Sequence, residues 1–137
     1  MTPQQIKFRG FRDETNEAVY GNLIYNGNDY LIREIEHDKG FHKSYFVEPD
    51  SLGMFTGLTD KNGKEIYGAI GENGGDIIRV DNFGIANNRV VSYVSQSARF
   101  HLMGTTHDNL YEALHDISGK NCSEIIGNQW EVENGKV

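Results

Sequence analysis

The segment at residues 57–67 constrains the fold more than any other part of this 137-residue chain. Asp60 can accept a hydrogen bond from the backbone two residues later, and Lys61 and Asn62 suit the central positions of a type I turn. Gly63 then takes a left-handed conformation at no steric cost, which gives a three-residue hairpin loop with a bulge. A two-residue type I′ turn at Asn62 and Gly63 is the competing register. Both registers predict antiparallel strands, and neither predicts an activity.

Short strand-like runs separated by turn residues occupy most of the chain. The composition of 16 Gly, 7 Phe, 7 Tyr and only 2 Pro is typical of short strands and tight turns. A short helix is predicted near residues 106–118, where Leu110, Leu114 and Ile117 recur at helical spacing. Residues 129–132 are expected to close the chain as a strand or sheet edge. The predicted fold is mainly β, with α+β as the alternative: a small antiparallel barrel or sheet assembly of about eight short strands.

The length predicts a single domain over residues 1–137, which is large enough to form a core without disulfides or metal. A subdivision near residue 50, into an N-terminal sheet and a C-terminal barrel, is the alternative. The one cysteine, Cys122, cannot form an internal disulfide and has no catalytic signature around it. No apolar run approaches the length of a membrane span and no apolar signal segment begins the chain, so a cytoplasmic protein is expected.

The net charge of −7, from 13 Lys and Arg against 20 Asp and Glu, disfavours binding to duplex nucleic acid, which normally requires a basic face. One stretch interleaves cations with rings, as surfaces for single-stranded nucleic acid do, and is made of Lys7, Phe8, Arg9, Phe11 and Arg12. Alternation alone also explains it, as a strand with Phe8 facing the core and with Lys7 and Arg9 facing solvent. We favour the second interpretation.

No set of side chains has the spacing of a metal or catalytic site, and we expect no cofactor. Among five histidines, no pair at helical spacing has a third clear ligand; the first candidates would be His101, His107 and His115. The glycines of residues 68–75 lead into a strand without a following lysine, so a flexible loop is favoured over a phosphate cradle. Gly75 and Asp76 are predicted turn residues. A general base at Asp76 is disfavoured, because a lone carboxylate has no visible acid partner.

Four segments occur in a recognisable order: residues 6–9 (IKFR), 55–67 (FTGLTDKNGKEIY), 75–80 (GDIIRV) and 125–128 (IIGN). In this order they resemble the YopX-like family of small phage and prophage proteins, over most of the chain. In the family the "IY" is usually followed almost at once by "GDI", whereas here residues 68–74 intervene. The resemblance implies a phage or mobile-element origin, a bacterial cytoplasm and a homo-oligomer. It implies no catalytic residues, because the family has no established activity.

These observations predict a phage- or prophage-type accessory protein that is non-enzymatic and associates with itself through tyrosines and strand edges. A small β-barrel that binds single-stranded nucleic acid through the basic and aromatic stretch is the alternative, and an enzyme with an unrecognised site is a third reading. The expected partners are a second copy of the chain and a host or phage protein, and neither nucleic acid nor a membrane is expected.

Overall fold

The computed structural model describes residues 6–35, 42–81, 88–105 and 109–134 of the chain. Within them lie two α-helices, α1 (Leu110–Leu114) and α2 (Gln129–Glu133), and a 3₁₀ helix, η2 (Pro49–Ser51). The strands are β1 (Phe8–Phe11), β2 (Ala18–Tyr25), β3 (Tyr30–Ile35), β4 (His42–Phe46), β5 (Gly53–Thr59), β6 (Glu65–Ala69), β7 (Asp76–Val80), β8 (Asn88–Val94), β9 (Arg99–Leu102) and β10 (Ser123–Asn128). The prediction of a mainly β fold is confirmed, with ten strands in place of about eight.

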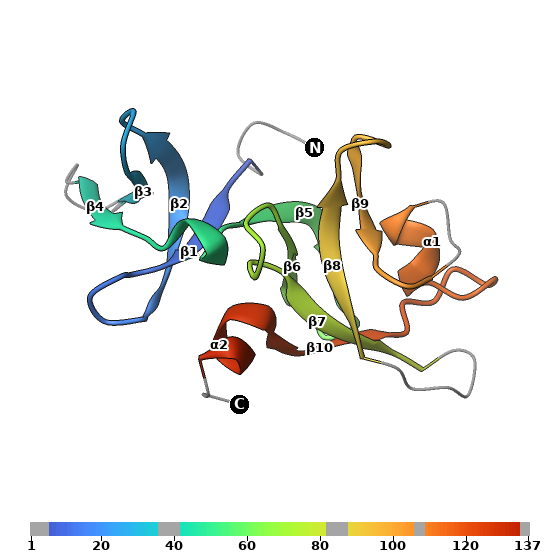
Figure 1. Ribbon diagram of the computed structural model, residues 1–137. Coiled ribbons are helices and arrows are strands. Elements are labelled where there is room, and N and C mark those ends of the chain that lie inside the picture. Colours follow the sequence, from blue (N-terminus) through green and yellow to red (C-terminus); the bar gives the residue numbers. More distant parts are fainter. Residues whose placement is uncertain (1–5, 36–41, 82–87, 106–108, 135–137) are drawn as a thin grey trace.

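The strands form one open sheet in the order β10-β7-β8-β6-β5-β1-β2-β3-β4, and β9 pairs with β8. The pairings are antiparallel except for a single parallel bridge between Ala69 of β6 and Ser92 of β8. Figure 1 shows β1 to β4 in one half of the molecule, with β5 to β10 and α1 in the other. The pairing of β1 with β5 joins the two halves.

Each half has its own group of buried apolar side chains. The first is formed by Val19, Ile32, Val47 and Leu52, with Phe8, Leu23, Tyr30 and Tyr45 packed against it. The second is formed by Ile66, Ile78, Val91, Leu102, Leu110, Ala113 and Leu114. The expected single domain over residues 1–137, and its alternative division near residue 50, stay predictions.

The turn of the hairpin at residues 57–67 has the three-residue form. The Asp60 N–H donates to the Lys64 carbonyl oxygen at 2.8 Å, and the Gly63 N–H donates to the Asp60 carbonyl oxygen at 3.0 Å. Gly63 has a φ of 81°, in the left-handed region that favours glycine. These hydrogen bonds set the register of the antiparallel pairing between β5 and β6 next to the turn.

The Asp60 carboxylate stabilises this turn by accepting hydrogen bonds from its backbone. Its Oδ1 accepts hydrogen bonds from the N–H groups of Asn62 and Lys64, at 2.9 and 3.0 Å. Its Oδ2 accepts the N–H of Ile125 in β10 at 3.0 Å. Buried Asp60 therefore closes the hairpin turn and also ties the hairpin to the strand at the end of the sheet.

The glycine-rich residues 68–75 pack closely against the segment that follows η2, in place of the flexible loop expected from the sequence. The Gly71 N–H donates to the Leu52 carbonyl oxygen at 2.8 Å. Gly74 lies so near that an added Cβ would be 1.8 Å from the same oxygen. The glycines therefore allow close approach of two backbone segments, and the loop forms part of the junction between the halves.

The predicted helix near residues 106–118 is shorter in the structure, and residues 106–108 lie outside the described part. Asn109 is the N-cap of α1, because its side chain accepts the N–H of Glu112 at 2.9 Å. The helix ends before Asp116, whose carboxylate accepts hydrogen bonds from Ser118 and Lys120 and forms a turn. Ile117 is therefore an exposed turn residue, and the assignment of Ile117 to the helix was wrong.

The prediction of a strand or edge at residues 129–132 was also wrong, because these residues begin α2. Asn128 ends β10 and caps the helix, since its side chain accepts the N–H of Glu131 at 2.9 Å. The Asn128 side chain favours a helix start over a longer strand. The apolar pattern of so short a segment fits a helix and a strand equally well, so it does not distinguish them.

Helix α2 contacts both halves of the molecule. The Gln129 N–H donates to the Gly75 carbonyl oxygen at 2.9 Å, and Gln129 Oε1 accepts the Gly75 N–H at 3.0 Å. On the other side, Trp130 Nε1 donates to Asn16 Oδ1 at 2.6 Å, and its ring stacks on Phe11 with centroids 6.2 Å apart. The helix thus fixes how the halves meet beside the cleft described next.

Candidate functional site

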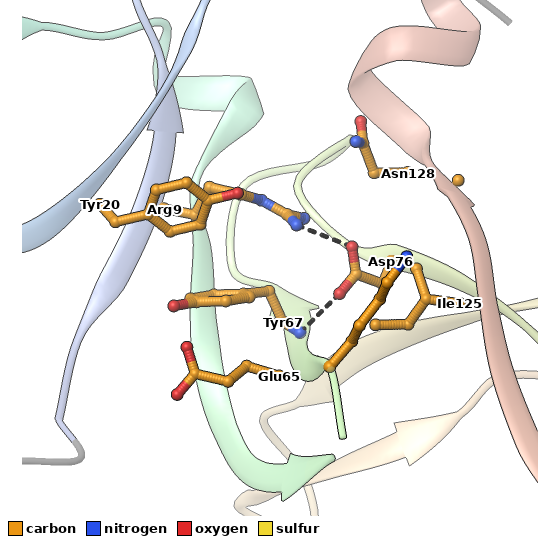
Figure 2. Close-up of a pocket in the computed structure, with 9 residues that line it drawn as sticks. Arg9, Tyr20, Glu65, Tyr67, Asp76, Ile125 and Asn128 are labelled. Carbon is orange, nitrogen blue, oxygen red and sulfur yellow. Dashed lines mark hydrogen bonds and ion pairs between the residues drawn. The ribbon is translucent and has the colours of Figure 1, made fainter. Parts of the chain in front are cut away.

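A cleft of about 360 Å³ lies where β1 and β2 meet β6, β7 and β10. Figure 2 shows its lining, which consists of Arg9, Tyr20, Lys64, Glu65, Tyr67, Asp76, Ile125, Gly127 and Asn128. The volume falls at the lower end of the roughly 300–1,000 Å³ typical of ligand pockets, so the cleft is large enough for a small ligand.

The floor of the cleft is a buried ion pair between Arg9 of β1 and Asp76 of β7. Arg9 Nη1 donates to Asp76 Oδ1 at 2.7 Å, and the two residues are 5% and 2% exposed. Asp76 Oδ2 accepts the N–H of Tyr67 at 2.7 Å, and Arg9 Nη2 donates to the Gly74 carbonyl oxygen at 3.0 Å. Figure 2 shows both contacts of Asp76 as dashed lines. The carboxylate is thus held by the Arg9 guanidinium, 67 positions away in the sequence, and by the Tyr67 N–H, 9 positions away.

Burial raises the pKa of the Asp76 carboxyl, whereas the Arg9 charge and the Tyr67 N–H oppose that rise. Burial also raises the pKa of the Tyr67 phenol, with a further contribution from the nearby Glu65 carboxylate. Shifted pKa values that gather in one cleft are more common at functional sites than elsewhere, although structural ion pairs produce them as well.

Two tyrosine rings form one wall. Tyr67 and Tyr20 pack edge to face, with centroids 5.5 Å apart. The Arg9 guanidinium lies over the Tyr67 ring, with Cζ 4.9 Å from its centroid. Tyr67 is buried, but Tyr20 is 47% exposed and offers part of its ring to a ligand.

Charged and polar side chains complete the lining. Glu65 forms an ion pair with Lys7, while Lys64 makes no ion pair with the residues that the structure describes. Gly127 sits at a register shift in the pairing of β10 with β7, and a Cβ added there would meet nothing within 4 Å. The cleft is therefore open at this glycine.

The basic and aromatic stretch at the N-terminus does not form one surface. Arg9 and Phe11 are buried, and Phe8 packs against the first core group. The expectation that Arg9 faces solvent was wrong, because a long cation at an alternating strand position can reach a buried carboxylate from another strand. Lys7 binds Glu65, and Arg12 lies over the Tyr45 ring at 4.3 Å.

The histidine candidates are not brought together in the described part of the chain. His101 Nε2 lies 2.8 Å from Ser97 Oγ, and His115 stacks on Tyr111 with centroids 4.0 Å apart. His107 lies outside the described residues. Among residues 6–35, 42–81, 88–105 and 109–134, no group of three or more His, Cys, Asp or Glu side chains could hold a metal ion.

Sequence reasoning singled out Arg9 and Asp76 separately and missed their pairing. The tyrosines were assigned only to self-association, and Tyr20, Tyr67 and Asn128 were not recognised as cleft residues. Their long sequence separation left no local signal. The aspartate of the "GDI" motif and the arginine of "IKFR" would have had to be paired by their charges.

In the described part of the chain, no helix is long and apolar enough to cross a membrane.

The comparison with protein families gives a match over residues 7–134 to the model described as YopX protein. The match covers both halves of the sheet, α2 and every residue of the cleft lining. The comparison with curated proteins gives no match.

Proposed function

The chain belongs to the YopX family, and we propose that it is a non-enzymatic accessory protein that associates with itself, as a phage- or prophage-type protein of the bacterial cytoplasm. The support for that setting is the family resemblance alone. The support for self-association is one structural feature, an apolar row on the outer face of β2, β3 and β4.

Cross-strand neighbours define this row. Ile24 pairs with Leu31, and Leu31 pairs with Phe46, so the three side chains share one face. The core group of the same strands uses the opposite face, through residues such as Ile32. Phe46 is 50% exposed, and the other two are half-buried. The row therefore reaches solvent on β4, the last strand of the sheet path.

A second copy of the chain is the occupant that fits this row. A twofold interface places the same patch on both partners, so the patch must be complementary to itself. An apolar row meets this requirement, because apolar side chains pack against one another. The adjacent row on the same face holds Asn22, Arg33 and Ser44, which are exposed and include no carboxylate. Two copies can therefore meet here without bringing their acidic excess together, despite the net charge of −7.

Binding of single-stranded nucleic acid has less support. This alternative requires the basic and aromatic stretch at the N-terminus to expose rings for stacking beside cations that are free to bind phosphates. Phe11 is buried against Trp130, and the Arg9 charge is used by Asp76. A titration with oligonucleotides at low salt, where electrostatic affinity is greatest, tests this alternative directly.

The test of self-association compares Phe46→Ser with a matched control, Tyr111→Ser, which removes an aromatic ring that is 53% exposed on α1. Light scattering behind size-exclusion chromatography should give an oligomer mass for the unmodified chain and for the control, and a lower mass for Phe46→Ser. A Phe46→Ser variant that associates like the unmodified chain contradicts the proposal.

A further inference from the structure

We propose that the cleft on the Arg9–Asp76 pair binds a carboxylate carried by a single aromatic or apolar ring. The lining of the cleft does not include Ile24, Leu31 or Phe46, so the inference does not depend on self-association through that row. It rests on the charges of the cleft, its size and the chemistry of its walls.

The first step is a balance of charges among the lining residues. Two cations and two anions line the cleft. Arg9 is compensated by Asp76, and Glu65 is compensated by Lys7, which is not part of the lining. Lys64 is the lining charge that has no ion pair within the described residues. One unpaired ammonium group favours a ligand with one negative charge.

The second step is the choice of anion. A phosphate monoester carries a charge of about −1.5 to −2 at neutral pH. Such a group would leave negative charge uncompensated beside Asp76 and Glu65, which are both acidic members of the lining. A carboxylate matches Lys64 one to one and accepts hydrogen bonds from its three N–H donors.

The third step concerns the part of the ligand that carries no charge. Tyr20 presents a half-exposed ring, and Ile125 lies in the same lining. Figure 2 shows Tyr20 and Ile125 on opposite sides of the Arg9–Asp76 pair, so a ligand ring between them would have an aromatic and an aliphatic neighbour. The volume of about 360 Å³ is sufficient for a ligand with a single ring and a carboxylate.

Two sources can supply this chemistry: a free small acid, or the carboxyl-terminal aromatic residue of a peptide. The probes are 3-phenylpropionate and a short peptide that ends in phenylalanine, each compared with its uncharged amide. Binding is followed by NMR through the backbone amides of Ile125 and Gly127. We expect saturable binding of the carboxylates with a Kd of ~1 mM or tighter, and weaker binding of the amides.

Four variants locate the site. Lys64→Met should weaken carboxylate binding at least about tenfold, Lys64→Arg should retain most of it, and Lys120→Met, which alters another exposed lysine, should leave it unchanged. Gly127→Leu places a side chain in the open space beside the cleft and should block binding while Trp130 fluorescence and unfolding stay normal.

Three results overturn the proposal: no saturable binding of either carboxylate, equal affinity for the amides, or unchanged affinity in Lys64→Met. If only the peptide binds, the site recognises a chain end; if only 3-phenylpropionate binds, it recognises a free acid; if both bind alike, it recognises the carboxylate and ring that they share. Phe46→Ser is expected to bind the probes like the unmodified chain, so a failure of self-association does not affect this test.

Discussion

Arg9 and Asp76, which are 67 positions apart in the sequence, form a buried ion pair at 2.7 Å that connects β1 to β7. The pair joins the two halves of the sheet and forms the floor of the cleft. Both charged groups are buried, so each one would destabilise the fold if the other were absent to neutralise it.

Removal of one partner should therefore be costly. Arg9→Met leaves the Asp76 carboxylate buried without a counter-charge, and we expect the free energy of unfolding to fall by about 3–5 kcal/mol. Lys120→Met is the matched control, because Lys120 is exposed and lies outside both the cleft and the outer face of β2, β3 and β4, and a change within about 0.5 kcal/mol is expected there. Urea unfolding measures both. A loss in Arg9→Met no larger than in the control would show that the pair does not stabilise the junction.

The double variant Arg9→Met/Asp76→Asn should recover part of this loss. The asparagine carries no charge and keeps an oxygen that can accept the Tyr67 N–H. If the double variant is less stable than Arg9→Met alone, the buried charge is not the cause of the loss.

The pH dependence of stability should reveal the same carboxylate. The pKa of Asp76 in the folded state is raised above its ordinary value of 3.8, so the folded state holds the proton more tightly than the unfolded state. The contribution of Asp76 to stability is then most favourable below pH 3.8, and it declines as the pH rises through the raised pKa. Arg9→Met removes the charge that opposes the rise, so the decline should be larger in that variant.

The measurement compares Arg9→Met with Arg9→Met/Asp76→Asn in urea unfolding at a series of pH values. The difference in the free energy of unfolding between them should grow in favour of the double variant as the pH rises above 3.8. A difference that stays constant across the series would mean that the carboxylate does not titrate with a raised pKa.

Asp60 should stabilise more of the structure than its turn position indicates. Asp60→Ala removes the acceptor of three backbone N–H groups, and a loss of about 3 kcal/mol or more is expected. Amide hydrogen exchange should become faster at Ile125 in β10 as well as at Asn62 in the turn. Protection of Ile125 that remains unchanged would show that the hairpin does not hold β10.

The glycine at position 74 should be required for contact between the halves. Gly74→Ala places a Cβ 1.8 Å from the Leu52 carbonyl oxygen, so the loop must move, at a cost of about 1–3 kcal/mol. Gly127→Ala is the matched control, because its Cβ meets nothing within 4 Å. Thermal unfolding should separate the two, and equal midpoints would contradict the close approach of residues 74 and 52.

The sequence predicted those features that depend on residues close together in the chain. Turn residues and alternation indicated a mainly β fold, and the residues around Gly63 indicated the hairpin. The end of α1 was misplaced and α2 was predicted as a strand, because the side chains of Asp116 and Asn128 bind backbone N–H groups two and three residues later and redirect the chain. The cleft was missed because its parts come from β1, β2, β6, β7 and β10, and only the sheet order brings them together.

The mass of the unmodified chain in solution tests the proposed function most directly. Sedimentation velocity over a range of protein concentrations should give a weight-average mass that rises above the 15.5 kDa of one chain toward a whole multiple of it. A mass that stays at 15.5 kDa at every concentration would contradict self-association through the outer face of β2, β3 and β4.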